Sequence, residues 1–401
     1  MIDCNVFIDA CLESGIRLVS GVPCSHLTPF INALLSQDRI RYVGASSEGE
    51  AVGIACGATL SGAGAAVICQ NSGLGNMVNP LTSLAWPFRL PLLLISTWRG
   101  RPGSVDEPQH ELMGQITPDL LELLGVRHRP FPTCEADVRN TIAAEVSRMR
   151  ESGRSSCLML DKEVFMHCDA PPAPARRSAA ILEIEDFRDG RAPARRADLL
   201  ERVLKATPDD VALITTTGKC GRELFTLADR EQQLYLVGSM GCASAVGLGV
   251  SLMSDRQVVV LDGDGAALMK LGNLATIGAT APSNLVHVII DNGVHDSTGG
   301  QPTSSHVVDF PAMATAAGYR SVLCCDSSAG FEAAYRRALA AEGPVMLHAS
   351  VSPGSMSPLG RPTVDPIDVA RRFSAFLSSG AGLSSGTRSP NPGDDEASRC
   401  R

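Results

Sequence analysis

The chain has 401 residues, of which 44% are hydrophobic and 19% are charged, so we expect two or three globular domains and not a mainly disordered protein. Lys and Arg number 35 and Asp and Glu number 43, which gives a formal net charge of −8. An acidic chain of this kind is a poor candidate for binding nucleic acid. No apolar run is long enough to cross a bilayer, so we expect no membrane span and no membrane partner.

The 13 cysteines do not form a pattern typical of a metal site or a disulfide framework. No CxxC pair occurs, and residues such as Cys56 and Cys157 lie singly within apolar stretches. We expect buried, reduced thiols and therefore a cytoplasmic protein. Asp3, Asp9 and Glu13 stand where a secretory signal would carry basic residues, which favours the same interpretation.

Short apolar runs alternate with helical stretches in two blocks, and each block has six expected strands. In chain order they are 17–22, 40–45, 65–70, 91–97, 127–131 and 157–161, then 211–216, 234–238, 257–262, 285–291, 321–325 and 345–350. Continuous apolar runs that alternate with helices are typical of parallel sheets built from βαβ units. The sequence therefore predicts an α/β fold with two doubly wound parallel-sheet domains.

Composition also sets the expected domain limits. The first domain covers 1–169, a Pro- and Arg-rich linker covers 170–196, and the second domain covers 197–377. The tail 378–401 is rich in Ser, Gly, Pro and charge, and we expect it to be disordered. Ligands in doubly wound sheets bind beyond the carboxyl ends of the strands, so motifs at those ends carry the functional information.

Two glutamates follow the expected strand 40–45. Ser47 and Glu50 have the spacing of a capping box, which gives Glu50 a structural task at the start of a helix. Glu48 has no such task, although both side chains also complement the helix dipole. Glu48 is therefore the better candidate for a carboxyl group that exchanges protons, and Glu50 stays the alternative.

The second domain contains a strand, the turn Gly263-Asp264-Gly265, a helix expected from Ala266 to about residue 279, and a second strand that ends before Asn292. Neighbouring parallel strands bring Asp264 and Asn292 to one sheet edge, where their oxygens, with a backbone carbonyl beyond Asn292, suit Mg²⁺. The glycines allow a phosphate to approach the backbone at the start of the helix. A simple turn after a strand is the alternative for the GDG stretch alone.

This unit resembles the signature of the thiamine-diphosphate enzymes. The resemblance implies that Asp264, Asn292 and the carbonyl of Val294 bind Mg²⁺, that thiamine diphosphate is the cofactor, and that the two domains bind its pyrimidine and its diphosphate. Most members end the motif with two asparagines, whereas this chain has Asp291 before Asn292. The glutamate that activates the cofactor in this family matches Glu48.

Other positions are carried over from the same resemblance. Met240, which follows Gly238 after a strand, matches the apolar residue that bends the cofactor between its two rings. Thr217 and Gly218 follow another strand end and offer a hydroxyl and an N–H group to the diphosphate. A core methionine and a plain polar turn are the corresponding structural alternatives.

Within this family, the chain is similar to the phosphonopyruvate decarboxylases and less closely to the sulfopyruvate decarboxylases. The similarity lies in 21–25, 47–53, 70–80, 98–110 and 292–301. It implies decarboxylation of a small 2-oxo acid, phosphonopyruvate, to phosphonoacetaldehyde and CO₂ in the biosynthesis of phosphonate antibiotics. Sulfopyruvate or another 2-oxo acid is the alternative substrate. Candidates that contact the substrate are Ser25, Arg99, Arg101, His110, His295 and Ser297, with Ser25, His110 and His295 assigned catalytic roles.

Two alternative interpretations assign the chain to other functional classes. A non-catalytic α/β scaffold would use the GDG stretch as a turn only, and a dehydrogenase would need a complete GxGxxG, which no strand end supplies. In the resembling family, the glutamate and the GDG unit of one site come from different subunits. Helices after Ser47 and after Ser239 are rich in Ala and Gly, which permits close helix packing. We therefore expect a homodimer or a dimer of dimers with shared sites.

Overall fold

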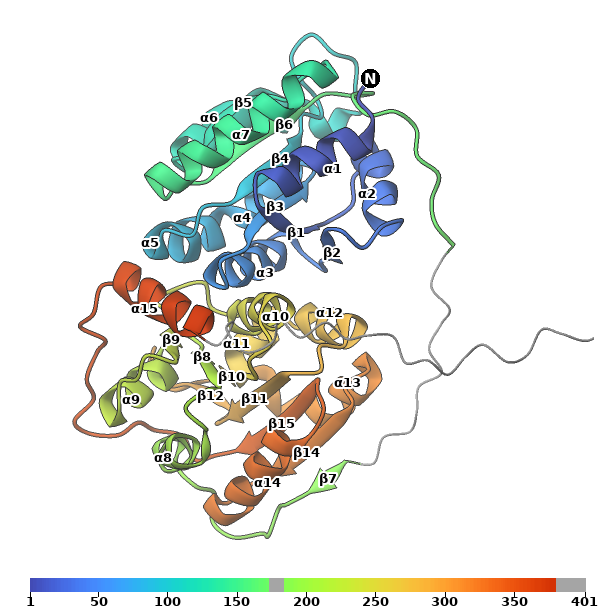
Figure 1. Cartoon of the computed structure of the whole chain (residues 1–401). Coiled ribbons are helices and arrows are strands. Elements are labelled where there is room, and N and C mark those ends of the chain that lie inside the picture. Colours follow the sequence, from blue (N-terminus) through green and yellow to red (C-terminus); the bar gives the residue numbers. More distant parts are fainter. Residues whose placement is uncertain (173–183, 380–401) are drawn as a thin grey trace, which may run out of the picture.

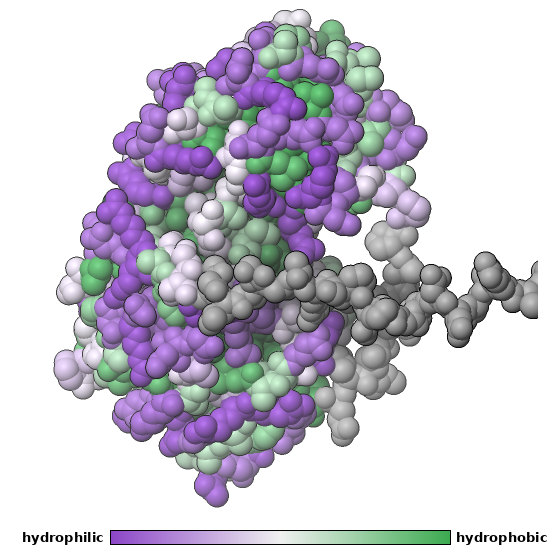
Figure 2. All heavy atoms as spheres, in the orientation of Figure 1, coloured by the Kyte–Doolittle hydropathy of each residue, from purple (hydrophilic) through white to green (hydrophobic). Residues whose placement is uncertain are grey.

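The computed structural model describes residues 1–172 and 184–379, and these form two α/β halves stacked one on the other (Figure 1). Hydrophilic residues cover most of both halves on the face shown in Figure 2, with smaller hydrophobic areas between them. No helix in 1–172 or 184–379 is long and apolar enough to cross a membrane.

The first half is a six-stranded parallel sheet with the order β2-β1-β3-β4-β6-β5. Its strands are β1 (Ile16–Gly21), β2 (Arg41–Gly44), β3 (Gly64–Cys69), β4 (Leu93–Thr97), β5 (Arg127–Pro130) and β6 (Ser156–Leu160). Its helices are α1 (Cys4–Glu13), α2 (Thr28–Leu35), α3 (Glu48–Leu60), α4 (Leu74–Pro80), α5 (Trp86–Phe88), α6 (Glu111–Leu123) and α7 (Glu135–Ser152). Helices α1, α2 and α7 bury apolar residues against one face of the sheet, and α3 and α4 against the other.

The second half is a seven-stranded parallel sheet with the order β7-β14-β15-β11-β10-β8-β9. Its strands are β7 (Glu185–Asp186), β8 (Ala212–Thr215), β9 (Gln233–Tyr235), β10 (Val258–Gly263), β11 (Leu285–Asp291), β14 (Ser321–Cys325) and β15 (Val345–Ser350), and β12 (Val294–His295) pairs separately with β13 (Gln301–Pro302). Its helices are α8 (Arg196–Ala206), α9 (Lys219–Leu227), α10 (Ala243–Met253), α11 (Asp264–Met269), α12 (Gly272–Thr280), α13 (Phe310–Ala317), α14 (Ser328–Ala340) and α15 (Pro366–Ser379).

The predicted fold class is confirmed, and each of the twelve expected strands forms within a few residues of its expected limits. Strand β7 lies inside the segment predicted as a linker and extends the second sheet beside β14. Helix α15 continues to Ser379, two residues into the predicted tail. The rest of the tail and 173–183 lie outside the described residues.

The helix predicted from 266 to about 279 is in fact two helices. Helix α11 begins earlier, at Asp264, and ends at Met269, and α12 begins at Gly272. The backbone of Lys270 leaves the helical region, with φ −134° and ψ 48°. Its ammonium group then lies 3.5 Å from the Ser47 hydroxyl at the start of α3, so the break connects the two halves.

The Ala- and Gly-rich helices pack against each other within this one chain. Helix α3 of the first half lies on α10 of the second (Figure 1). A Cβ at Gly57 would stand 2.1 Å from the Val246 carbonyl oxygen, and one at Gly249 would stand 2.0 Å from the Ile54 carbonyl oxygen. Such contacts require glycine. The small residues therefore serve an interface inside the chain, and they no longer argue for a dimer.

The cysteines of the described residues are free thiols, and all of them except Cys134 and Cys168 are buried. Burial raises the pKa of the Cys157 thiol to about 12 and that of the Cys220 thiol to about 12. These thiols are packing residues, as predicted, and they are not reactive nucleophiles.

Candidate active site

The ends of β10 and β11 meet at one edge of the second sheet. Gly263 is in register with Ile290, so Asp264 and Asn292 leave the sheet side by side. They line a cavity of about 230 Å³ together with residues that follow β8 and residues of the β12–β13 ribbon. All of the residues that line it belong to the second half. They include Thr216, Thr217, Gly218, Lys219, Met240, Gly263, Asp264, Gly265, Ala266, Asn292, Val294, His295, Asp296 and Ser297.

Asp264 is a buried carboxylate at the first residue of α11, with 3% of its surface exposed. Its Oδ2 accepts a 2.5 Å hydrogen bond from the Thr303 hydroxyl, a partner that the sequence analysis did not find. Burial raises the pKa of Asp264 above its ordinary value, although the Thr303 bond opposes this. A cation beside this carboxylate would offset the cost of burying its charge.

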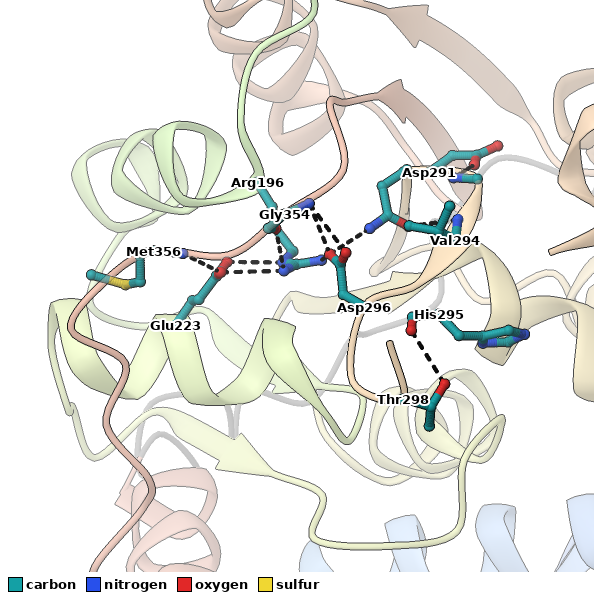
Figure 3. A network of polar contacts seen from close by, with 11 residues as sticks. Arg196, Glu223, Asp291, Val294, His295, Asp296, Thr298, Gly354 and Met356 are labelled. Atoms are coloured by element: carbon teal, nitrogen blue, oxygen red, sulfur yellow. Dashed lines mark hydrogen bonds and ion pairs between the residues drawn. The ribbon is translucent and has the colours of Figure 1, made fainter. Parts of the chain in front are cut away.

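Asn292 is held by its own turn and by a buried ionic network, in which Figure 3 shows Arg196 between Glu223 and Asp296. Its Nδ2 donates to Asp296 Oδ2 at 2.7 Å, and its Oδ1 accepts from the Val294 N–H at 3.2 Å. Because the amide nitrogen is committed to Asp296, the amide oxygen keeps a second lone pair for another partner. Asp296 in turn accepts from Arg196 Nη1 at 3.1 Å.

Arg196 is the centre of this network, although it lies almost one hundred residues from Asn292 in the chain. Its Nε donates to Glu223 Oε2 at 2.8 Å and its Nη2 to the Gly354 carbonyl at 3.0 Å. The Arg196 side chain is 8% exposed and the Glu223 side chain 0% exposed. The sequence did not predict this network of Arg196, Glu223 and Asp296. Its members are far apart in the chain and meet only in the tertiary fold, so no local motif indicates the ion pairs.

Asp291 occupies the position where the resembling family carries its first asparagine. Its Oδ2 lies 3.1 Å from His348 Nε2 on the neighbouring strand β15, and its Oδ1 accepts from the Gly293 N–H. Burial alone would raise the pKa of Asp291, but the His348 bond and charge outweigh it and hold the pKa below its ordinary value. His348 therefore gives this chain a local reason for an aspartate.

Several groups in the cavity suit a phosphate ligand. The Thr216 hydroxyl is buried and has no hydrogen-bond partner among the described residues, and Lys219 also lines the cavity. Gly218 has φ +95°, a conformation that favours glycine, and no atom lies within 4 Å of an ideal Cβ at Gly263. The open backbone and an unpartnered hydroxyl fit a diphosphate, with Lys219 as a cation that the sequence analysis missed.

The remaining predicted residues of this half divide into two groups. Met240 and His295 face the cavity across Gly265, because a Cβ at Gly265 would stand 2.6 Å from His295 Cε1 and 3.4 Å from Met240 Cε. The Thr217 hydroxyl donates to the Val237 carbonyl at 3.2 Å. Gly238 does not line the cavity and is pressed against Ser83 of the first half.

The two glutamates at the start of α3 differ in their surroundings. Ser47 caps the helix by accepting from the Glu50 N–H, as predicted, but the Glu50 carboxylate binds the N–H and hydroxyl of Ser46 and not the N–H of Ser47. Glu50 is fully buried, whereas Glu48 is partly exposed and accepts from Asn76 Nδ2 at 2.8 Å. Glu48 does not line the cavity around Asp264 of its own chain.

Ser25 and His110 lie at the carboxyl edge of the first sheet and do not line the cavity around Asp264. The Ser25 hydroxyl accepts from Arg99 Nη1 at 3.3 Å. His110 precedes α6 and is 6% exposed, and its buried Nδ1 has no partner among the described residues. The candidate residues thus form two groups, one at the carboxyl edge of each sheet.

The donor set around Asp264 fits one divalent ion. No cluster of three or more His, Cys, Asp or Glu side chains occurs within 1–172 and 184–379. A metal here would rely on the Asp264 carboxylate, the Asn292 amide oxygen and a backbone carbonyl, which are the hard oxygen ligands that Mg²⁺ prefers. Further oxygens would come from water or from a bound phosphate.

Comparison with known proteins shows which family domain each half matches. Residues 4–123 match the N-terminal TPP-binding domain of the thiamine pyrophosphate enzymes, and residues 217–349 match their C-terminal TPP-binding domain. Thiamine pyrophosphate is another name for thiamine diphosphate. Solved structures agree in fold: benzoylformate decarboxylase from Polynucleobacter necessarius superposes with a TM-score of 0.69 at 13% identity, over 88% of this chain and 99% of its own.

Curated relatives match along most of the chain. The phosphonopyruvate decarboxylase of Streptomyces viridochromogenes is 50% identical over 90% of this chain and 92% of its own length. That of Streptomyces hygroscopicus is 47% identical, over 93% and 94% respectively. The sulfopyruvate decarboxylase of Methanosarcina acetivorans is 28% identical over 92% of this chain and 96% of its own. The chain therefore belongs to the thiamine pyrophosphate enzyme family.

Proposed function

We propose that this enzyme decarboxylates phosphonopyruvate to phosphonoacetaldehyde and CO₂, with thiamine diphosphate and Mg²⁺ as cofactors. The main support is the 50% identity to a phosphonopyruvate decarboxylase over 90% of this chain. The sulfopyruvate decarboxylase at 28% identity supports the alternative substrate less strongly. The buried reduced thiols support a cytoplasmic site of action. The similarity to phosphonopyruvate decarboxylases suggests a place in the biosynthesis of phosphonate antibiotics.

The second half supplies the groups that hold the cofactors in this proposal. Asp264, Asn292 and the Val294 carbonyl bind Mg²⁺, and Thr216 and Lys219 bind the diphosphate. When bound, thiamine diphosphate supplies a sink for the electron pair that remains when CO₂ leaves. Met240 contributes an apolar contact, and Gly265 keeps the space beside it open.

The first half supplies the proton transfer. Glu48 is the carboxyl group that exchanges a proton with the aminopyrimidine nitrogen, because it is partly exposed and its hydrogen bond from Asn76 fixes its position. Glu50 is less suited, because its carboxylate is fully buried and holds Ser46. His295 lines the cavity near Met240 and is placed to donate or accept a proton on the substrate side.

We further propose that each site combines Asp264 of one subunit with Glu48 of another, in a homodimer or a dimer of dimers. The support is that, among the described residues, only those of the second half line this cavity, so Glu48 of the same chain does not contribute to it. Mixing Glu48→Gln and Asp264→Ala subunits tests this. Random exchange should restore about a quarter of wild-type activity, since half of the dimers are mixed and each regains one intact site.

The assay that tests the substrate measures CO₂ and aldehyde from phosphonopyruvate, sulfopyruvate and pyruvate in parallel, with the Mg²⁺-loaded enzyme. The proposal expects the highest kcat/KM with phosphonopyruvate. Higher kcat/KM with sulfopyruvate would favour the alternative. Absence of CO₂ release from every substrate, with cofactor bound, would contradict decarboxylation itself.

A further inference from the structure

A second and larger cavity, of about 700 Å³, opens at the carboxyl edge of the first sheet. Residues that follow β1, β4 and β6 line it, among them the cations Arg99, Arg101 and Lys162. It lies on the same sheet edge as Glu48, because the helix that Glu48 begins follows β2, and β2 neighbours β1. The functional groups described so far leave this cavity unused.

Arg99 is held firmly while part of its guanidinium stays available. Its Nε and Nη2 donate to Asp106, at 2.7 and 2.5 Å. Asp106 also accepts from the N–H groups of Gly100 and Glu107, at 2.8 Å each, so all its acceptor positions are filled. These bonds hold the pKa of Asp106 well below its ordinary value. Asp106 therefore orients Arg99 and has no free acceptor to compete for another cation.

The free side of Arg99 points toward Ser25. Its Nη1 donates to the Ser25 hydroxyl at 3.3 Å, although Arg99 follows β4 and Ser25 follows β1. Strand β3 lies between these two strands, so the Arg99 side chain reaches across it toward the end of the sheet that carries Glu48. Because a guanidinium has five N–H groups, protons on Nη1 and Nη2 remain for an anion.

The other two cations form exposed ion pairs that take little free energy to break. Arg101 lies over the Trp98 ring at 4.9 Å and pairs with Asp161 at 2.5 Å, with the two side chains 48% and 43% exposed. Within 1–172 and 184–379, the ion pair of Lys162 is with the exposed Glu163. Exposed pairs of this kind contribute little to stability, so an incoming anion can replace the carboxylates. His26 also lines the cavity, and its buried Nδ1 lacks a partner within 1–172 and 184–379.

We propose that this cavity holds the phosphonate group of the substrate, with Arg99 as the anchor and Arg101 and Lys162 at the rim; the inference rests on the proposed function. Phosphonopyruvate carries two anionic ends, and only the phosphonate keeps its charge through the reaction. Cations beside the departing carboxylate would stabilise the substrate more than the transition state and slow the reaction. Cations beside the phosphonate bind both equally and leave the barrier unchanged.

The test compares phosphonopyruvate with pyruvate, which lacks the phosphonate, in the holoenzyme. Arg99→Lys loses the planar fork, and Arg101→Gln and Lys162→Gln lose a rim charge from exposed positions where folding is unaffected. Arg99→Lys should lower kcat/KM for phosphonopyruvate by about 10- to 100-fold, as expected for a charged hydrogen bond. The two rim variants should lower it by up to about fivefold, as expected for exposed pairs. All three should leave kcat/KM for pyruvate nearly unchanged. Arg139→Gln is the matched control, since Arg139 forms an exposed pair with Glu13 in the same half.

A binding measurement separates this inference from the proposed function. Calorimetric titration of the holoenzyme with methylphosphonate should show binding that Arg99→Lys and Arg101→Gln weaken and Arg139→Gln does not. This result supports the subsite even if another 2-oxo acid proves to be the substrate. Equal methylphosphonate affinity in wild type and both cavity variants, or an unchanged ratio of kcat/KM between the two substrates, would overturn the subsite.

Discussion

Replacing Arg196 by Met tests the buried network that orients Asn292. The substitution keeps most of the side-chain volume but removes a charge that is 8% exposed and leaves the fully buried Glu223 carboxylate without its partner. Loss of one partner of a buried ion pair typically costs about 3–5 kcal/mol. Arg196 also donates to Asp296 and to the Gly354 carbonyl, so we expect the upper part of that range.

The assay is urea unfolding of the cofactor-free protein, followed by far-UV circular dichroism. Tryptophan fluorescence is unsuitable, because Trp86 and Trp98 both lie in the first half and the lesion lies in the second. The double variant Arg196→Met/Glu223→Met removes the orphaned charge as well and should recover part of the loss, because an apolar replacement of a buried pair is often tolerated. The matched control is Arg202→Met on the same helix, whose pair with Glu332 is about one-third exposed.

Two results would refute this reasoning. The first is an Arg196→Met variant that loses less than about 1 kcal/mol, which is the range of an exposed pair. The second is a double variant whose loss equals the sum of the two single losses, because strict additivity indicates no coupling. A correct network also predicts weaker Mg²⁺ affinity in Arg196→Met, since Asp296 would then hold the Asn292 amide less firmly.

Three further predictions follow from the carboxylates. Asp264→Asn should raise the melting temperature of the cofactor-free protein, because it removes a buried charge. It should also abolish the rise in melting temperature that Mg²⁺ and thiamine diphosphate cause. An unchanged rise on adding these cofactors would contradict the metal assignment. Because the pKa of Asp264 is raised, Mg²⁺ affinity should fall as the pH drops through that pKa, and calorimetry across pH checks it. Glu48→Gln should slow exchange of the thiazolium C2 proton by roughly 10²–10⁴-fold. Glu50→Gln should mainly weaken the buried bonds to Ser46, at a cost of about 1–3 kcal/mol of stability. Equal exchange rates in the two variants would reject the distinction.

The backbone of the site was predictable from sequence, because parallel strands announce themselves as continuous apolar runs. The run 285–291 predicts β11 with its observed limits. Asp264 follows β10 as predicted, but no separate turn forms there, because β10 ends at Gly263 and α11 begins at Asp264. Helix α11 was harder, since residues 264–280 contain no proline that would indicate the break at Lys270.

The partners of the site residues were not predictable in the same way. His348 contacts Asp291 because the sheet order places β15 beside β11. Thr303 contacts Asp264 because it follows the β12–β13 ribbon, which lies beside the cavity. Gly238 shows the opposite case, because a match to a family position did not reveal that Ser83 covers it. Motif spacing reports residues within one βαβ unit, whereas these contacts join different units.

The two cavities divide the proposed chemistry between the halves of the chain. The smaller one, around Asp264, offers a metal site and phosphate donors, and the larger one, around Arg99, offers cations for an anionic substrate. Substitutions should therefore separate into two classes. Those at Asp264 or Asn292 should change the concentration of cofactor needed for half-maximal activity, whereas those at Arg101 or Lys162 should change the KM for phosphonopyruvate at saturating cofactor. Because each kind of variant leaves the other cavity intact, one titration with cofactor and one with substrate distinguish the two classes. A variant of either class that shifted both constants equally would show that the two cavities are not independent sites.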